Sequence, residues 1–170
     1  QIVFFADEAE EWVKQDKVVI LIGAGQSPGE GVGNGRAAAL AYAREGAKVL
    51  AVDRDLLAAS DTASAVAAEG GICQPFQADV TREAELTAAI MDAKKRWQRI
   101  DVLHYNVGVS LAGGDRTPLE ITEDAFDNVN AINLRGYVMA VKHVLPIMRA
   151  QRSGVILSIS SVAAWSTTYP

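Results

Sequence analysis

The chain has 170 residues and a net charge of −5 at pH 7, which suits one globular domain. Lys and Arg form no basic stripe, and no uninterrupted apolar run reaches the roughly 18 residues of a membrane span. Nucleic acid and membranes are therefore not expected as partners. The single cysteine, Cys73, excludes an internal disulfide and fits a reducing, cytoplasmic compartment.

Strand-like and helix-like segments alternate along most of the chain. Residues 1–16 lack the features of a signal peptide, and we interpret them as an N-terminal extension. Apolar runs, typical of strands that are buried on both faces, predict strands at 18–22, 48–52, 72–77, 100–105 and 155–159. Capping and breaking residues predict helices at 36–45, 56–69, 81–97 and 122–149.

Two of these helices carry finer expectations. Thr81 is the expected N-cap of its helix, and Gly136 and Pro146 are expected to interrupt the last one. The repeated βαβ pattern predicts an α/β domain over residues 17–170, with a Rossmann-type doubly wound parallel sheet.

The segment after the first expected strand is rich in glycine. It reads G-A-G-Q-S-P-G-E-G-V-G-N-G-R from Gly23 to Arg36. A dinucleotide site needs glycine here, because the backbone turns tightly and approaches the pyrophosphate, and the next helix packs close to the strand. The sequence therefore predicts a dinucleotide loop, with a flexible surface loop as the alternative; the predicted contacts are Gly23, Gly25, Gly33, Asn34 and Gly35.

This loop also supports two local expectations. Residues 26–31 lengthen it and should bulge outward. Replacement of either Gly33 or Gly35 by valine should block cofactor binding, because a side chain would stand in the way of the phosphates.

An acidic residue, Asp53, directly follows the second expected strand, in V-D-R-D. A carboxylate at this position binds the ribose hydroxyls of NAD and repels the extra phosphate of NADP. Arg54 beside it could instead receive that phosphate. We expect NAD rather than NADP, and the alternative role of Asp53 is to cap the next helix.

Polar residues also follow the later strands. Asp79-Val80 ends the third strand region, where Asp79 could simply open the next helix, and Asn106 could stitch strand ends together. Asn133 is a poor residue for a helix interior, which favours a functional role over a solvent-facing one. The Ser160-Ser161 pair ends the fifth strand. His104 and His143 have no spacing that suggests a metal site.

Several of these motifs together resemble the short-chain dehydrogenase/reductase family. Ile22-Gly23-Ala24 and Gly33-Asn34-Gly35 resemble the two ends of its T-G-x-x-x-G-x-G motif, with isoleucine for threonine and a longer loop. The stretch Gly29-x-x-x-Gly33-x-Gly35 alone also fits the glycines of that motif. Residues 105–108 resemble its N-N-A-G motif, in which Asn106 and Gly108 are kept and Tyr105 and Val107 differ.

The resemblance implies an NAD(P)-dependent oxidoreductase that transfers a hydride between nicotinamide and an alcohol or carbonyl substrate. It also implies roles for single residues. Asp79 and Val80 would contact the adenine, and Asn106 and Gly108 would lie against the cofactor. Asn133 would anchor a proton relay through a water, and Ser161 would hold the oxygen of the substrate.

The family's Tyr-x-x-x-Lys pair would fall beyond Pro170, since Tyr169 comes too early and no lysine follows it. The chain is therefore interpreted as C-terminally truncated, with five of the family's seven strands, and as inactive alone. The full-length form is expected to be a homo-oligomer. Two alternatives stay open at this point: a dinucleotide-binding module without catalysis, and an S-adenosylmethionine methyltransferase, which shares the glycine loop and the acidic residue.

Overall fold

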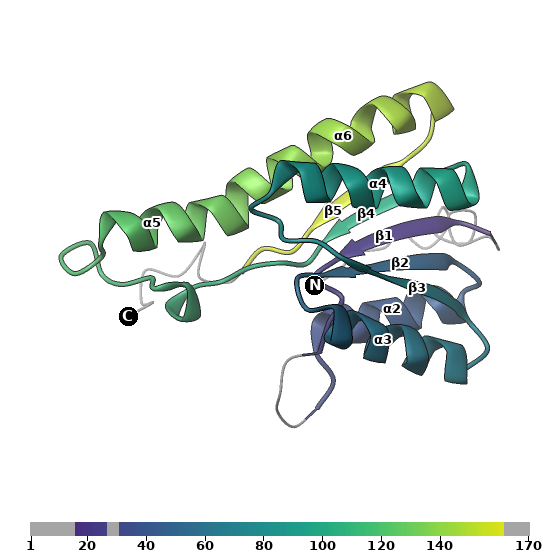
Figure 1. Cartoon of the computed structure of the whole chain (residues 1–170), viewed down its shortest axis with the longest axis horizontal. Coiled ribbons are helices and arrows are strands. Elements are labelled where there is room, and N and C mark those ends of the chain that lie inside the picture. The colour runs from purple at the N-terminus through teal and green to yellow at the C-terminus, as the bar shows by residue number, and fades with distance from the viewer. Residues whose placement is uncertain (1–15, 27–30, 162–170) are drawn as a thin grey trace.

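The structure, a computed structural model, describes residues 16–26 and 31–161. Its centre is a parallel sheet of five strands in the order β3-β2-β1-β4-β5 (Figure 1). The strands are β1 Val18–Ile22, β2 Lys48–Asp53, β3 Ile72–Gln77, β4 Val102–Tyr105 and β5 Val155–Ser158. The expected doubly wound Rossmann-type sheet is confirmed.

Helices cover both faces of this sheet (Figure 1). α2 and α3 pack on one face, and α4 and α6 pack on the other. The helices are α2 Asn34–Arg44, α3 Leu56–Ala68, α4 Glu83–Trp97, α5 Glu123–Asn130 and α6 Gly136–Gln151, with a short 3₁₀ turn η1 at Leu111–Gly113. The order of these elements agrees with the sequence pattern.

The side chains of β1 show why the sequence favours this arrangement. Val19 and Leu21 point into the cluster under α2 and α3, whereas Ile20 and Ile22 point into the cluster under α4 and α6. All residues of β1 are buried, so an apolar side chain is needed at every position. The unbroken apolar run thus reflects two cores that share one strand.

The start of α4 differs from the sequence expectation. Thr81 is not its N-cap; the cap position is Arg82, whose side chain makes no capping hydrogen bond. The Thr81 backbone N–H and hydroxyl both donate to Asp79 Oδ1, at 2.8 and 2.7 Å. Thr81 therefore belongs to a turn around Asp79, because its hydroxyl is already used there.

The expected long last helix is broken next to Gly136, one of the two predicted positions, and not at Pro146, the other. α5 runs into a π-helical turn, η2 Ala131–Arg135, which leads into α6. Pro146 lies inside α6 and does not interrupt it, so that expectation is wrong. The break lies at residues 131–135, directly before Gly136, so the structure places it next to that predicted position. It contains Asn133, and π-helical turns of this kind are frequent at functional sites.

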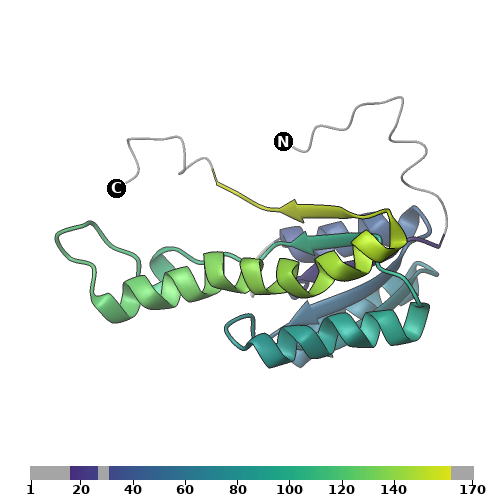
Figure 2. The ribbon, with the colours of Figure 1, turned by 90° about the horizontal axis from the view of Figure 1, so that it is seen from above.

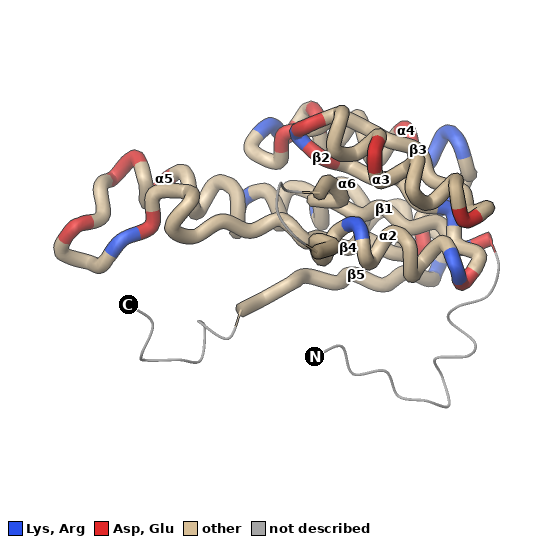
Figure 3. Tube along the Cα trace, turned by 90° about the horizontal axis from the view of Figure 1, so that it is seen from below, with Lys and Arg blue, Asp and Glu red and all other residues tan. Residues whose placement is uncertain are grey.

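The edge strand β5 is the most open part of the sheet. None of its four residues is buried, whereas all five of β1 are. Seen from above, it lies at the sheet edge beside β4 (Figure 2). Lys and Arg positions are interspersed with Asp and Glu positions over the described chain, without a basic stripe (Figure 3).

Candidate active site

A cleft of about 890 Å³ lies at the carboxyl ends of the strands. It opens around β1, which lies between β2 and β4, where the order of the strands reverses. Ligands of open α/β sheets bind at this switch point. Every site residue predicted from the sequence lines this cleft: Gly23, Gly25, Gly33, Asn34, Gly35, Asp53, Arg54, Asp79, Val80, Asn106, Gly108, Asn133 and Ser161.

The glycine loop approaches β1 and β2 most closely at two points. Gly23 has a positive φ of 83°, and its N–H and that of Ala24 both donate to the Val52 carbonyl. A Cβ on Gly35 would lie 2.0 Å from the carbonyl oxygen of Gly23. The first turn of α2 can therefore pack against the end of β1 only if residue 35 is glycine.

Gly33 is not constrained in the same way. A Cβ built on it would lie 3.4 Å from Oε1 of Gln26, an ordinary contact with a flexible side chain. From the sequence, Gly33 and Gly35 were expected to be equally intolerant of a side chain. In the structure, only a Cβ on Gly35 would clash with backbone, at the Gly23 carbonyl oxygen. Of the loop's expected bulge, residues 27–30 lie outside the described part of the chain.

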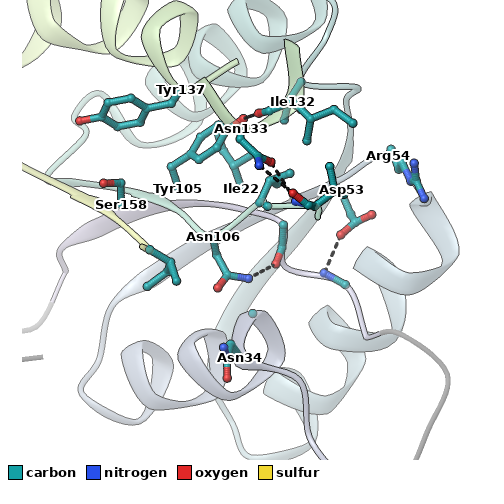
Figure 4. Close-up of a pocket in the computed structure, with 18 of the residues that line it drawn as sticks. Ile22, Asn34, Asp53, Arg54, Tyr105, Asn106, Ile132, Asn133, Tyr137 and Ser158 are labelled. Atoms are coloured by element: carbon teal, nitrogen blue, oxygen red, sulfur yellow. Dashed lines mark hydrogen bonds between the residues drawn. The ribbon is translucent and has the colours of Figure 1, made fainter. Parts of the chain in front are cut away.

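Asp53 fastens the glycine loop to the end of β2 (Figure 4). Its Oδ2 accepts from the Gly25 N–H at 2.9 Å, and its Oδ1 accepts from the Asp55 N–H at 3.1 Å. The alternative that Asp53 caps α3 is wrong, because Asp55 caps it by accepting from Leu57 and Ala58. The Asp53 carboxylate instead stays at the cleft.

Asp79, which follows β3, also lines the cleft, and its backbone N–H and its carboxylate are both hydrogen-bonded. Its own N–H donates to Glu85 Oε2 at 2.8 Å, and its carboxylate receives the two bonds from Thr81. The bond from the Thr81 N–H is the main reason why the pKa of Asp79 is lowered; the Thr81 hydroxyl and the charges of Arg82 and Arg54 add to it, and burial opposes it. Val80 beside it is buried.

Asn106 stitches the ends of two strands together. Its Nδ2 donates to the Gly23 carbonyl at 2.9 Å, and its N–H donates to the Ile22 carbonyl at 2.9 Å (Figure 4). Because Asn106 also lines the cleft, the structural role and the proposed cofactor role are compatible.

Asn133 lies in the π-helical turn and clamps the loop that follows β4. Its Oδ1 accepts from the Val109 N–H at 2.8 Å, and its Nδ2 donates to the Val109 carbonyl at 2.7 Å. The side chain is exposed, but both of its polar groups are bonded to Val109. Each group keeps one further hydrogen-bonding position, a lone pair on Oδ1 and a proton on Nδ2.

Tyr105 is a contributor to the site that the sequence analysis did not identify. It is 2% exposed, and its hydroxyl donates to the Ile132 carbonyl at 2.5 Å, next to Asn133. Burial and the Asp79 charge raise the pKa of Tyr105, so its hydroxyl remains a donor. The sequence held one indication of this role: Tyr105 replaces the first asparagine of the N-N-A-G motif, and its hydroxyl is still a hydrogen-bond donor.

The last described residues of the chain also line the cleft. Ser158, Ser160 and Ser161 border it together with Tyr137 of α6, and these three serines are exposed. Tyr137 meets Tyr105 edge to face, with ring centroids 5.7 Å apart. Tyr169 lies outside the described residues.

Two kinds of feature are absent from the part of the chain that the structure describes. No helix there is long and apolar enough to cross a membrane. No group of three or more His, Cys, Asp or Glu side chains there could hold a metal ion. The two histidines contact protein groups instead: His104 contacts Tyr42, and His143 contacts Glu83.

Comparison with known proteins decides the family. The family model described as short chain dehydrogenase matches residues 17–169. This chain belongs to the short-chain dehydrogenase family. The methyltransferase alternative is therefore wrong. Levodione reductase of Leifsonia aquatica is 37% identical over 150 residues, which are 86% of this chain and 53% of that protein.

Two further proteins that this chain resembles are dehydrogenases by name. The 2-(S)-hydroxypropyl-CoM dehydrogenase 3 of Xanthobacter autotrophicus is 35% identical over 135 residues, 79% of this chain and 52% of that protein. A 7α-hydroxysteroid dehydrogenase solved with NADH and 7-oxo glycochenodeoxycholic acid is 28% identical with a TM-score of 0.82, covering 94% of this chain and 59% of that one. The chain spans about half the length of the curated relatives it matches.

Proposed function

We propose that this chain forms the cofactor-binding part of an NAD-dependent oxidoreductase, which transfers a hydride between nicotinamide and an alcohol or carbonyl substrate. One observation carries the proposal. The cleft runs from Asp53 at the end of β2, past the glycine loop, to Ser161 after β5. Its two ends thus offer a carboxylate for a ribose and a hydroxyl for a substrate oxygen.

The residues present fit a dinucleotide. Asn34 and Gly35 open α2, and within the described chain their backbone N–H groups have no hydrogen-bond partner. Donors at a helix start attract phosphate, because the helix dipole places positive charge there. Asp53 would bind the adenosine ribose, Asp79 and Val80 would border the adenine, and Asn106 and Gly108 would border the nicotinamide side.

The chemistry of hydride transfer is supplied by the nicotinamide when it is bound. Ser161 donates a hydrogen bond to the substrate carbonyl oxygen, which makes the carbonyl carbon more electrophilic. Asn133 serves this step as a positioning residue, because it fixes Val109 in the loop that borders the same cleft. A change at Ser161 should therefore affect turnover, with little effect on the dinucleotide.

Activity tests this role directly. In the complete protein, Ser161→Ala should lower kcat about 100-fold on any ketone that the wild type reduces, because one donor to the developing oxyanion is lost. The dissociation constant for NADH should change less than about twofold. A wild-type protein that binds NADH but turns over no alcohol or ketone would favour the module without catalysis.

The preference for NAD over NADP rests on Asp53. Its carboxylate would accept hydrogen bonds from the ribose hydroxyls and would repel a 2′-phosphate. Calorimetric titration with NADH and NADPH should give tighter binding of NADH, and Asp53→Asn should reduce the difference about tenfold. Arg54→Ala is the matched control, with little effect on NADH. Tighter NADPH binding by the wild type would reverse the assignment and point to Arg54.

We also propose that the complete enzyme is a cytoplasmic homo-oligomer with a small alcohol or ketone as its substrate. Apolar side chains on α5 and in the π-helical turn support self-association: Phe126 is 56% exposed and Leu134 is 58% exposed. Light scattering coupled to size-exclusion chromatography would measure the mass, and a monomer at working concentration would refute the oligomer.

A further inference from the structure

One side chain, Gln26, bridges two points of the lengthened glycine loop. It follows Gly25, just after the loop leaves β1. Its Oε1 accepts from the Gly33 N–H at 2.7 Å, and its Nε2 donates to the Gly31 carbonyl at 3.3 Å. Both polar groups of the amide are thus bonded to the far arm of the loop.

A carboxamide is suited to this bridge, because it carries a donor and an acceptor in one rigid plane without charge. The bridge joins the two arms of the loop across residues 27–30, so their separation is fixed by Gln26 itself. A longer loop would otherwise cost more conformational entropy when it closes around a ligand. With the Gln26 bridge in place, the long loop can present its backbone N–H groups to a ligand as a short loop would.

The bridge also decides which donors at the start of α2 are left for a ligand. Gly33 is the N-cap residue, and its N–H is already held by Gln26. The next two N–H groups, those of Asn34 and Gly35, have no partner in the described chain. Because the Gln26 oxygen is neutral, it satisfies Gly33 without cancelling the positive end of the helix dipole.

We propose that Gln26 is a positioning residue for the diphosphate of the cofactor: it closes the loop and holds Gly33, so that the N–H groups of Asn34 and Gly35 face the phosphates. The inference rests on the proposed function and assigns a determinant of affinity within that site. Gln26 acts on the diphosphate and not on the adenosine, because its contacts lie at the loop, whereas Asp53 and Asp79 lie on the adenosine side.

The experiment compares three ligands with the complete protein. NADH and ADP contain the diphosphate, whereas adenosine lacks it. Gln26→Ala should weaken NADH and ADP about tenfold, through the loss of the two bonds that order the loop. Binding of adenosine, followed by ligand-observed NMR, should not change. Gln26→Glu should weaken the two charged ligands more than Gln26→Ala does, because its carboxylate repels phosphate; salt should reduce this extra loss.

Asn128→Ala is the matched control. Asn128 also holds a loop carbonyl through its amide, that of Gly113 at 3.0 Å, but it lies away from the cleft. Its loss should leave all three affinities unchanged. Equal thermal unfolding midpoints of the variants would show that any loss of affinity is local.

The outcomes separate the two proposals. A wild type that binds no NADH overturns the proposed function and this inference with it. A wild type that binds NADH, beside a Gln26→Ala variant with unchanged affinity for ADP, overturns only the inference. An equal loss for adenosine and ADP also overturns it, because Gln26 would then act on the whole site.

Discussion

The two ends of the parallel sheet are tied together in different ways. At the amino ends, the buried carboxylate of Asp101 accepts from the Val18 N–H at 2.9 Å and forms two bonds with the Arg99 guanidinium, at 2.8 and 2.6 Å. Lys17 lies 3.7 Å from the same carboxylate. Charge is balanced by charge within the protein, and the cleft of about 890 Å³ lies at the opposite end of the sheet.

At the carboxyl ends, single side chains hold backbone groups of the loops. Asp53 holds Gly25, Asn106 holds Gly23, and Asn133 holds Val109. These bonds fix the loops around an open cleft instead of filling it. The difference teaches that one end of the sheet serves stability and the other serves binding, so substitutions at the two ends should have separable effects.

The largest effect is expected at the amino ends. Asp101→Ala should lower the free energy of unfolding by about 3 kcal/mol, because it leaves the Val18 N–H unsatisfied and removes the partner of Arg99. NADH binding by the folded variant should not change. Urea unfolding measures the stability and calorimetric titration measures the affinity for NADH. A variant as stable as the wild type but with weaker NADH binding would contradict the division of roles between the two ends of the sheet.

The pH dependence of this effect has a definite sign. Burial opposes the charged form of Asp101, but the bonds from Arg99 and Val18 and the charge of Lys17 outweigh it and lower its pKa. The stabilisation is therefore complete above the unfolded pKa and is lost as pH falls through the folded one. The gap in stability between wild type and Asp101→Ala should be constant from pH 5 to 7 and should shrink below about pH 4.

The sequence was sufficient to predict the fold and the membership of the cleft, because these follow from local patterns. Apolar runs mark strands that are buried on both faces, as in β1, and polar residues after parallel strands must meet at one edge of the sheet. The grouping of Asp53, Asn106 and Ser161 at one cleft follows from that rule alone.

The contacts inside the site could not be predicted, because they depend on distances between segments far apart in the chain. The two bonds of Asn133 reach Val109, which is 24 residues away, and the hydroxyl of Tyr105 reaches Ile132. The different constraints on Gly33 and Gly35 follow from how closely α2 approaches Gly23. Threonine is a common N-cap residue, which is why Thr81 was expected to cap α4. Its hydroxyl instead donates to Asp79 Oδ1.

An intermediate effect is expected at the glycine loop, where two neighbouring residues form a matched pair. Gly35→Ala places a methyl group 2.0 Å from the Gly23 carbonyl, so α2 must move away from β1. NADH affinity should fall more than about 50-fold, and stability should fall by about 2 kcal/mol from the strain. Gly33→Ala meets only Gln26 at 3.4 Å and should weaken NADH less than about threefold. Equal losses in the two variants would show that the close approach of α2 does not control the site.

The smallest effect is expected at Tyr105, which braces the π-helical turn below the carboxyl-end cleft. Tyr105→Phe keeps the ring and its edge-to-face contact with Tyr137, and removes only the donor to the Ile132 carbonyl. The free energy of unfolding should fall by about 1 kcal/mol. NADH affinity should fall less than about twofold, because the clamp between Asn133 and Val109 remains.

A second substitution shows whether the hydroxyl acts through this turn. A Cβ on Gly136, the first residue of α6, would lie 2.5 Å from the Tyr105 hydroxyl and 3.0 Å from the Val80 carbonyl. Gly136→Ala should therefore be strongly destabilising in the wild type and less so in the Tyr105→Phe background, where the nearer contact is gone. A double-mutant cycle on unfolding free energies should give a coupling of about 1 kcal/mol. If the two losses of unfolding free energy simply add, the Tyr105 hydroxyl does not fix the position of α6 relative to the π-helical turn. Only the ring of Tyr105 would then support this turn.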